Sequence, residues 1–127
     1  MSKNIGYVGF LPIVHTENLQ ATAEYYRDVL GFSIDENLVS DDFVMLWAPG
    51  GDDTWHQLGL MNSGKDHQPG RGQVIGVAVE GIDEIFAAVK EQGAKILFAI
   101  EDRPWSCREF GVEDPNGYHL YFRECGP

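Results

Sequence analysis

Aromatic and polar side chains that could bind a small molecule concentrate in the stretch 103–122. Trp105 lies near its beginning, and His119 and Tyr121 lie near its end. An indole offers a flat apolar surface with one hydrogen-bond donor, and an imidazole can exchange a proton near neutral pH. Side chains of these types on short strands predict one wall of a small-molecule site.

The same stretch has the pattern of a β-hairpin. Asp114-Pro115-Asn116-Gly117 is a turn sequence, because Asp bonds to nearby main chain, Pro fixes φ, and Asn and Gly accept positive φ. Alternation then places three residues of each arm on a common face: Arg108, Phe110 and Val112 on one arm, and Tyr118, Leu120 and Phe122 on the other. Arg108 and Glu109 are neighbours, so they point to opposite faces unless a bulge intervenes. We expect one of them to form a structural ion pair.

His15 and His119 could meet in a cavity as metal ligands or as an acid/base pair. None of the four histidines stands in a metal-binding spacing such as H-E-x-x-H, and no Ser-His-Asp arrangement follows from spacing. The alternative interpretation, which we favour, has His15 at the end of a strand and His119 as a hydrogen-bonded residue of the cavity wall. We therefore expect no catalytic residue.

Apolar periodicity predicts the same order of elements twice, a strand, a helix and three strands. The predicted elements are strands at 9–14, 32–34, 43–48 and 57–61 with a helix at 18–30, then strands at 74–79 and 94–100 and the hairpin with a helix at 82–89. Residues 35–42 are interpreted as an acidic connection. Gly31 and Gly93 end the two helices.

This repeat predicts an α+β fold of two βαβββ modules in one domain. The first module is residues 1–61, the linker 62–72, and the second module 73–127. Neither module would bury its sheet alone, so the modules should pair. Eight strands in two curled mixed sheets would leave a concave cavity lined by alternate residues.

The composition narrows the class of partner. The chain of 127 residues has 9 basic and 20 acidic residues, a net charge of −11. This charge repels nucleic acid, and no apolar run is long enough to cross a membrane, so we expect neither partner and a cytoplasmic location. Cys107 and Cys125 lack C-x-x-C spacing, and we expect two free thiols in a reducing compartment.

The order of the elements, the segment 24–32 (Glu-Tyr-Tyr-Arg-Asp-Val-Leu-Gly-Phe) and the segment 113–117 (Glu-Asp-Pro-Asn-Gly) resemble the vicinal oxygen chelate superfamily. That superfamily includes glyoxalase I, extradiol dioxygenases, and fosfomycin- and bleomycin-resistance proteins. Pro104-Trp105 followed by Arg108-Glu109-Phe110 is most similar to the bleomycin-resistance proteins. These bind the drug unaltered, as dimers whose subunits form two clefts. The resemblance implies a homodimer with Trp105 lining a cleft.

The resemblance also implies where a metal would be held. By count from the motifs, three ligand positions fall on Leu11, Val74 and Tyr121, and the fourth on Gln57 or Gly59. Leu and Val offer no N, O or S donor to a divalent metal. We therefore expect no metal and no cofactor.

The function predicted from the sequence is metal-independent sequestration of a small cationic or aromatic molecule similar to bleomycin. One alternative is a metal-dependent lyase, isomerase or dioxygenase that uses unusual ligands such as His15 and His119. A second alternative is a dimeric scaffold without a small-molecule role. The residues expected to line the ligand site are Trp105, Arg108, Phe110, Tyr121, His119, His15, Leu11 and Trp47.

Overall fold

The computed structural model describes residues 9–51, 56–64 and 73–126. Its elements in chain order are β1 (Ile13–Thr16), α1 (Leu19–Asp28), β2 (Ser33–Val39), β3 (Phe43–Trp47), β4 (Gln57–Asn62), β5 (Val74–Ala78), α2 (Ile82–Glu91), β6 (Lys95–Asp102), β7 (Cys107–Glu113) and β8 (His119–Cys125). The predicted α+β order of two βαβββ modules is confirmed. Neither of these helices is both long enough and apolar enough to cross a membrane.

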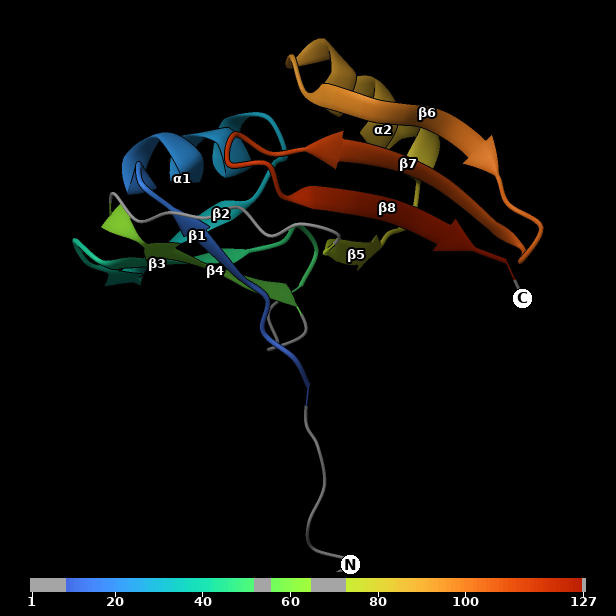
Figure 1. The fold of residues 1–127 in the computed structure, drawn as a ribbon. Coiled ribbons are helices and arrows are strands. Elements are labelled where there is room, and N and C mark those ends of the chain that lie inside the picture. Colours follow the sequence, from blue (N-terminus) through green and yellow to red (C-terminus); the bar gives the residue numbers. More distant parts are fainter. Residues whose placement is uncertain (1–8, 52–55, 65–72, 127) are drawn as a thin grey trace, which may run out of the picture.

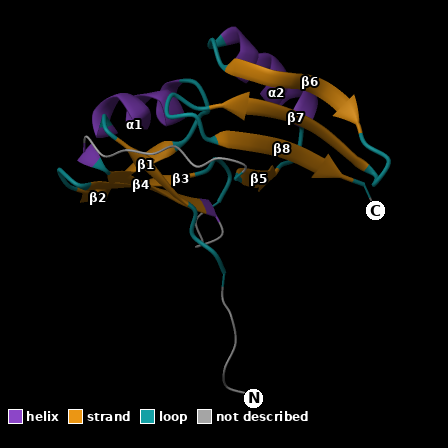
Figure 2. Cartoon of the chain, viewed as in Figure 1, coloured by secondary structure: helices purple, strands orange, loops and turns teal. Residues whose placement is uncertain are grey.

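Each module forms one four-stranded mixed sheet, in the orders β1-β4-β3-β2 and β5-β8-β7-β6 (Figure 1). The first strand of each module pairs in parallel with the last, and the other pairs are antiparallel. Figure 2 shows the helices beside the two sheets, and contacts place α1 on the first sheet and α2 on the second. Each sheet thus has one face covered by a helix and one face free of it.

The helix boundaries follow from local chemistry. The side chain of Asn18 accepts a hydrogen bond from the N–H of Ala21 and caps α1, as the sequence predicted. Gly31 and Gly93, with φ of 83° and 92°, follow the two helices in the left-handed region that glycine adopts without strain. The apolar side of each helix faces its sheet, so each sheet packs against a helix on one face only.

Two strand predictions needed correction. β1 begins at Ile13 rather than at residue 9, directly after Pro12, which has no N–H to give to a ladder. The residues interpreted as an acidic connection after Ile34 instead extend β2 to Val39. β2 is an edge strand whose second half is exposed, so charged side chains do not prevent it from forming. Of the expected linker, residues 65–72 lie outside the described residues.

The β7–β8 turn joins the two modules. Its Asp114 accepts a hydrogen bond from the hydroxyl of Tyr26 in α1 at 2.7 Å, and Asn116 donates to the hydroxyl of Thr22 at 2.9 Å. The hydroxyl of Tyr118 accepts the main-chain N–H of His15 in β1 at 3.1 Å. One apolar core continues through both modules. The segment that carried the resemblance therefore fixes one module to the other.

Cys107 and Cys125 form a disulfide, so the expectation of two free thiols is wrong. The two residues are direct partners in the antiparallel register of β7 and β8, which brings their Cα atoms within 4.0 Å. The sequence separates them by 18 residues, and only the hairpin register brings them together. The bridge closes the open end of this hairpin.

Candidate functional site

The face of the second sheet that α2 leaves free carries polar side chains and two aromatic rings. Register places four rows of residues there: Cys107, Glu109, Gly111 and Glu113 of β7, His119, Tyr121, Arg123 and Cys125 of β8, Val74, Gly76 and Ala78 of β5, and Phe98 of β6. The residues between them in β7 and β8 point toward α2. This free face is the candidate binding surface.

Trp105 is the most prominent apolar group beside this face. It lies in the β6–β7 connection, where the main-chain N–H of Arg103 bonds to the carbonyl oxygen of Cys107 at 2.7 Å and Ser106 adopts a left-handed φ of 65°. Its side chain is 59% exposed, although its indole N–H donates to Glu109 at 3.2 Å. An indole anchored at its nitrogen, with its ring open to solvent, can stack on a flat ligand.

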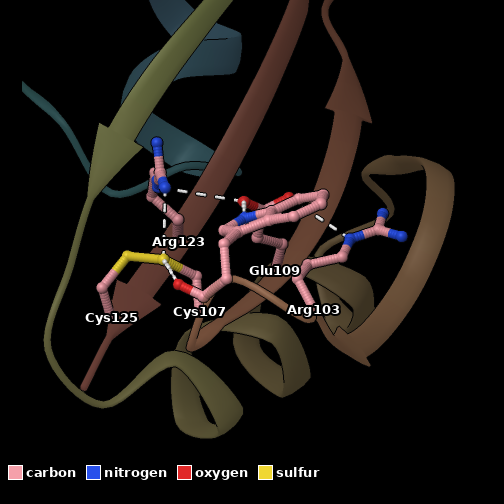
Figure 3. The surroundings of a disulfide bond; sticks show 6 residues. Arg103, Cys107, Glu109, Arg123 and Cys125 are labelled. Carbon is pink, nitrogen blue, oxygen red and sulfur yellow. Dashed lines mark hydrogen bonds and ion pairs between the residues drawn. A yellow bond between two sulfur atoms is a disulfide. The ribbon is translucent and has the colours of Figure 1, made fainter.

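Glu109 is the buried anion of the face, with 7% of its surface exposed. Arg103 and Arg123 flank it, with Nε atoms 3.4 Å and 3.8 Å from its two carboxylate oxygens (Figure 3). The pairs compensate the loss of water around the carboxylate. Arg103 also pairs with the exposed Glu101 at 2.8 Å, so the two guanidinium groups of this cluster are matched by two carboxylates.

Two aromatic side chains, Phe98 and Tyr121, lie on the free face next to this cluster and are called its aromatic floor. The rings of Phe98 and Tyr121 meet edge to face with centroids 4.9 Å apart, and the guanidinium of Arg103 lies 5.0 Å from the Phe98 centroid. Phe98 lies across Gly111, where a Cβ atom would come within 2.5 Å of the ring. The absence of a side chain at Gly111 therefore makes room for the Phe98 ring.

Three titratable side chains lie together at the far end of the face. The imidazole Nε2 of His119 lies 3.3 Å from Glu113, which also pairs with Lys95 of β6. The lysine, and then the histidine, hold the pKa of the Glu113 carboxyl below its usual value. His119 is thus a hydrogen-bonded wall residue, which is the interpretation we favoured from the sequence.

The structure does not bring Arg108 and Phe110 to the free face. Phe110 is fully buried on the opposite face, where its ring packs against Phe86 of α2 at 5.0 Å and is stacked with Phe122 at 4.8 Å. Arg108 pairs there with Asp83 of α2 and with Asp102, both at 2.9 Å. Period two turns both residues toward the helix, so neither lies on the candidate surface. The structural ion pair expected for Arg108 or Glu109 is formed by both of them.

The other predicted residues lie on the first module. The indole of Trp47 donates to Asp35 at 3.0 Å, and the register of β3 places Trp47 on the face opposite α1. Leu11 precedes β1 with 41% of its surface exposed. His15 in β1 contacts the second module through its main-chain N–H. Among the described residues, no hydrogen bond, ion pair or ring contact joins Trp47, Leu11 or His15 to Trp105 or Glu109.

The donor set does not fit a metal of the kind that the resemblance implies. At the expected positions, Leu11 and Val74 are exposed aliphatic residues and Tyr121 packs against Phe98. Within residues 9–51, 56–64 and 73–126, no three His, Cys, Asp or Glu side chains lie together so as to hold an ion. The one buried carboxylate of the free face, Glu109, is already paired with two guanidinium groups.

Sequence reasoning missed Phe98, Arg103, Gly111 and Arg123. Arg123 follows Tyr121 by two residues and Gly111 follows Glu109 by two, so the alternation already used for the hairpin would have found both. Phe98 could not be found in this way, because the pairing of β6 with β7 shifts register on both sides of it. Arg103 lies in a connection, where periodicity gives no orientation.

Known proteins support the same architecture. The family model for the Glyoxalase/Bleomycin resistance protein/Dioxygenase superfamily matches residues 5–122. A glyoxalase-related enzyme from Clostridium phytofermentans is 21% identical with a TM-score of 0.78, covering 98% of this chain and 100% of its own. TioX from Micromonospora sp. ML1 is 18% identical with a TM-score of 0.72, covering 94% and 100%.

A superfamily member from Sphaerobacter thermophilus DSM 20745 is 25% identical with a TM-score of 0.74, covering 95% of this chain and 98% of its own. No curated protein matched the sequence. The structural similarities extend over nearly the whole chain, so they concern both modules and not one of them alone.

Proposed function

The chain belongs to the Glyoxalase/Bleomycin resistance protein/Dioxygenase superfamily, and we propose that it sequesters a small aromatic or cationic molecule without a metal, as the bleomycin-resistance proteins do. The observation that carries the proposal is Trp105, whose ring is open to solvent while Glu109 fixes its nitrogen. Phe98 and Tyr121 continue the aromatic surface on the sheet. Such a surface suits a planar group that stacks and does not react.

Charge affects the binding of a ligand in two ways, at long range and at the wall itself. The net charge of −11 raises the concentration of cations around the whole molecule. On the wall itself, Glu109 and Glu101 are both paired with guanidinium groups, so affinity there rests on stacking rather than on an unpaired anion. We therefore expect a ligand whose flat part meets Trp105 and whose positive charge, where it has one, stays away from Arg103 and Arg123.

A homodimer is part of the same proposal. β1 and β5 are each at the edge of their sheet, and Ile13 in β1 and Val74 in β5 are 39% and 44% exposed. Phe10, just before β1, is 77% exposed. Apolar side chains along unpaired strand edges favour association with another chain. A second copy would bring a first-module face, with Trp47, opposite the Trp105 wall and so close a cleft.

Calorimetric titration with bleomycin, followed in parallel by tryptophan emission, tests the binding. Trp105→Ala should raise Kd about threefold to tenfold, since aromatic contacts contribute about 0.5–1.5 kcal/mol. Leu38→Ala, which also truncates an exposed apolar residue but lies in β2, is the matched control and should bind like the wild type. No heat with bleomycin at high micromolar concentration would remove that drug as the ligand.

Two further measurements separate the alternatives. Elemental analysis of protein purified without chelator should find no stoichiometric transition metal, and a tightly held ion would favour the enzyme instead. Light scattering should give a dimer that Ile13→Lys together with Val74→Lys converts to a monomer. A dimer that binds neither bleomycin nor other planar aromatic cations would favour a scaffold role.

A further inference from the structure

The disulfide lies at the end of the candidate binding face, two residues from its buried anion along β7. Cys107 and Glu109 share the free face, as do Cys125 and Arg123 on the paired strand. Figure 3 shows Arg123 beside the bridge, with dashed lines that join it to the bridge and to Glu109. The bridge is therefore part of the surface that carries the ion-pair cluster.

The two sulfur atoms are not equally accessible. Cys107 is buried, with 6% of its surface exposed, whereas Cys125 is exposed near the end of the chain. A pocket of about 560 Å³ opens beside the bridge, lined by both cysteines, Arg103, Ser106, Gly126 and three further residues. A small molecule entering this pocket can approach Cys125, and Cys107 then lies behind it as the leaving sulfur.

A guanidinium is placed at the leaving sulfur. Nη2 of Arg123 lies 3.1 Å from Sγ of Cys107, although a disulfide sulfur carries no charge and is a weak acceptor. Nε of Arg123 is buried and has no hydrogen-bond partner among the residues that the structure describes. The other charged groups near the bridge are Glu109, shared between Arg123 and Arg103, and Asp102, Arg108 and Glu124, which line the pocket. The guanidinium of Arg123, 3.1 Å from Sγ of Cys107, would stabilise a thiolate formed at that sulfur.

We propose that Cys107–Cys125 is a thiol–disulfide exchange site for low-molecular-weight thiols, in which Cys125 is attacked and Cys107 leaves as a thiolate stabilised by Arg123. In the cytoplasm, the compartment that the sequence predicts, such thiols are the abundant reductant. The proposal goes beyond ligand sequestration and does not depend on it.

The exchange consists of two successive displacements at sulfur. The thiolate of the incoming molecule forms a bond to Sγ of Cys125 while the bond between the two protein sulfurs breaks. The electron pair of that bond leaves with Sγ of Cys107, beside Arg123. A second small thiol attacks the mixed disulfide, a small disulfide departs, and Cys125 takes up a proton from water. The protein bridge is reduced by two electrons, and two thiols are oxidised to one disulfide.

Reduction by dithiothreitol, quenched in acid and followed by alkylation and mass spectrometry, tests the role of Arg123. Arg123→Gln should slow reduction about tenfold, because a poorer leaving thiolate departs more slowly. Arg123→Lys keeps the charge and should recover most of the rate. Arg27→Gln, which removes the same charge from the exposed end of α1, is the control and should match the wild type. Equal rates in all four proteins would overturn the assignment to Arg123.

Trapping the mixed disulfide shows which sulfur is attacked, and it does so even if Arg123→Gln fails to fold. Wild-type protein treated briefly with reduced glutathione, quenched in acid and alkylated, should carry at least about tenfold more glutathione on Cys125 than on Cys107 by peptide mass spectrometry. More adduct on Cys107 would reverse the proposed direction. Wild-type protein that keeps two free thiols in oxidised glutathione would overturn the exchange site altogether, whatever the bleomycin titration gives.

Discussion

Tyr26 in α1 donates its hydroxyl to Asp114 in the β7–β8 turn at 2.7 Å, across 88 residues of sequence. Asp114 is 3% exposed and also accepts the main-chain N–H groups of Asn116 and Tyr118, at 2.8 and 2.9 Å. Burial raises the pKa of the Asp114 carboxyl, and the hydrogen bond from Tyr26 acts against that rise. Burial, and then the Asp114 charge, raise the pKa of Tyr26 well above its usual value. This contact holds the two modules together.

Tyr26→Phe should lower the free energy of unfolding by about 1.5–3 kcal/mol near neutral pH, because a buried carboxylate loses a donor. The pKa of Asp114 should rise further without that donor, so the folded state would bind its proton at higher pH. Protonation of Asp114 stabilises the folded state, and this stabilisation appears as the pH falls through the folded pKa. The loss of unfolding free energy caused by Tyr26→Phe should therefore be smaller at lower pH. Urea unfolding at about pH 7 and about pH 5 measures it, and a loss that grows in acid would contradict the sign.

Gly111→Ala should disturb the aromatic floor of the candidate site. The added Cβ would come within 2.5 Å of the Phe98 ring, and overpacking of this kind costs about 1–3 kcal/mol. Gly76→Ala is the matched control in the same sheet, where a Cβ meets nothing within 4 Å. Thermal unfolding and bleomycin titration of both variants should show a loss only at Gly111. Equal behaviour of the two would mean that Phe98 moves aside freely.

Glu109→Gln should destabilise the cluster around Trp105. The amide keeps an acceptor for the indole but leaves Arg103 and Arg123 without the charge between them, a loss of about 1–2 kcal/mol after allowance for their partial exposure. Glu101→Gln removes the exposed partner of Arg103, and exposed pairs contribute less than about 1 kcal/mol. Chemical unfolding should find the larger loss of stability in the Glu109 variant and the smaller loss in the Glu101 variant. The substitution at Glu109 should weaken the binding of planar cations more than that of planar neutral molecules.

Arg108→Gln should change stability by no more than about 1 kcal/mol and leave bleomycin affinity unchanged. Its two ion pairs are exposed, and it lies on the face that packs against α2. Arg103→Gln makes the same substitution beside Phe98 and Trp105 and should weaken binding. If calorimetry finds the larger loss at Arg108, the ligand lies on the helix side and the proposed wall is misplaced.

The order of the elements could be predicted because apolar periodicity and turn chemistry are local properties. Asn18, Gly31, Gly93 and the turn 114–117 gave signals that the structure confirms. The same alternation placed Phe110 on one face with Val112, but it could not say which face the helix would cover. Phe110 therefore entered the predicted site, while its odd-numbered neighbours form the wall.

The disulfide and the arginine cluster could not be predicted from composition or spacing. Cys107 and Cys125 become partners only through the register of β7 and β8, which the length of the turn sets. Arg103 approaches Glu109 from a connection whose Ser106 adopts a left-handed φ. Contacts of this kind depend on several elements at once, so a single sequence carries no direct signal for them.

The β7–β8 hairpin is fastened at both ends, by Tyr26 and Thr22 at its turn and by the cysteine bridge at its opening. A ligand that meets Trp105 and Tyr121 thus finds a wall whose shape exists before it arrives. Little ordering entropy is then lost on binding, and association should be fast. Solvent viscosity should slow association only through its effect on diffusion, because the wall does not have to rearrange. Opening the bridge would release one fastening and convert a rigid receptor into one that must adapt.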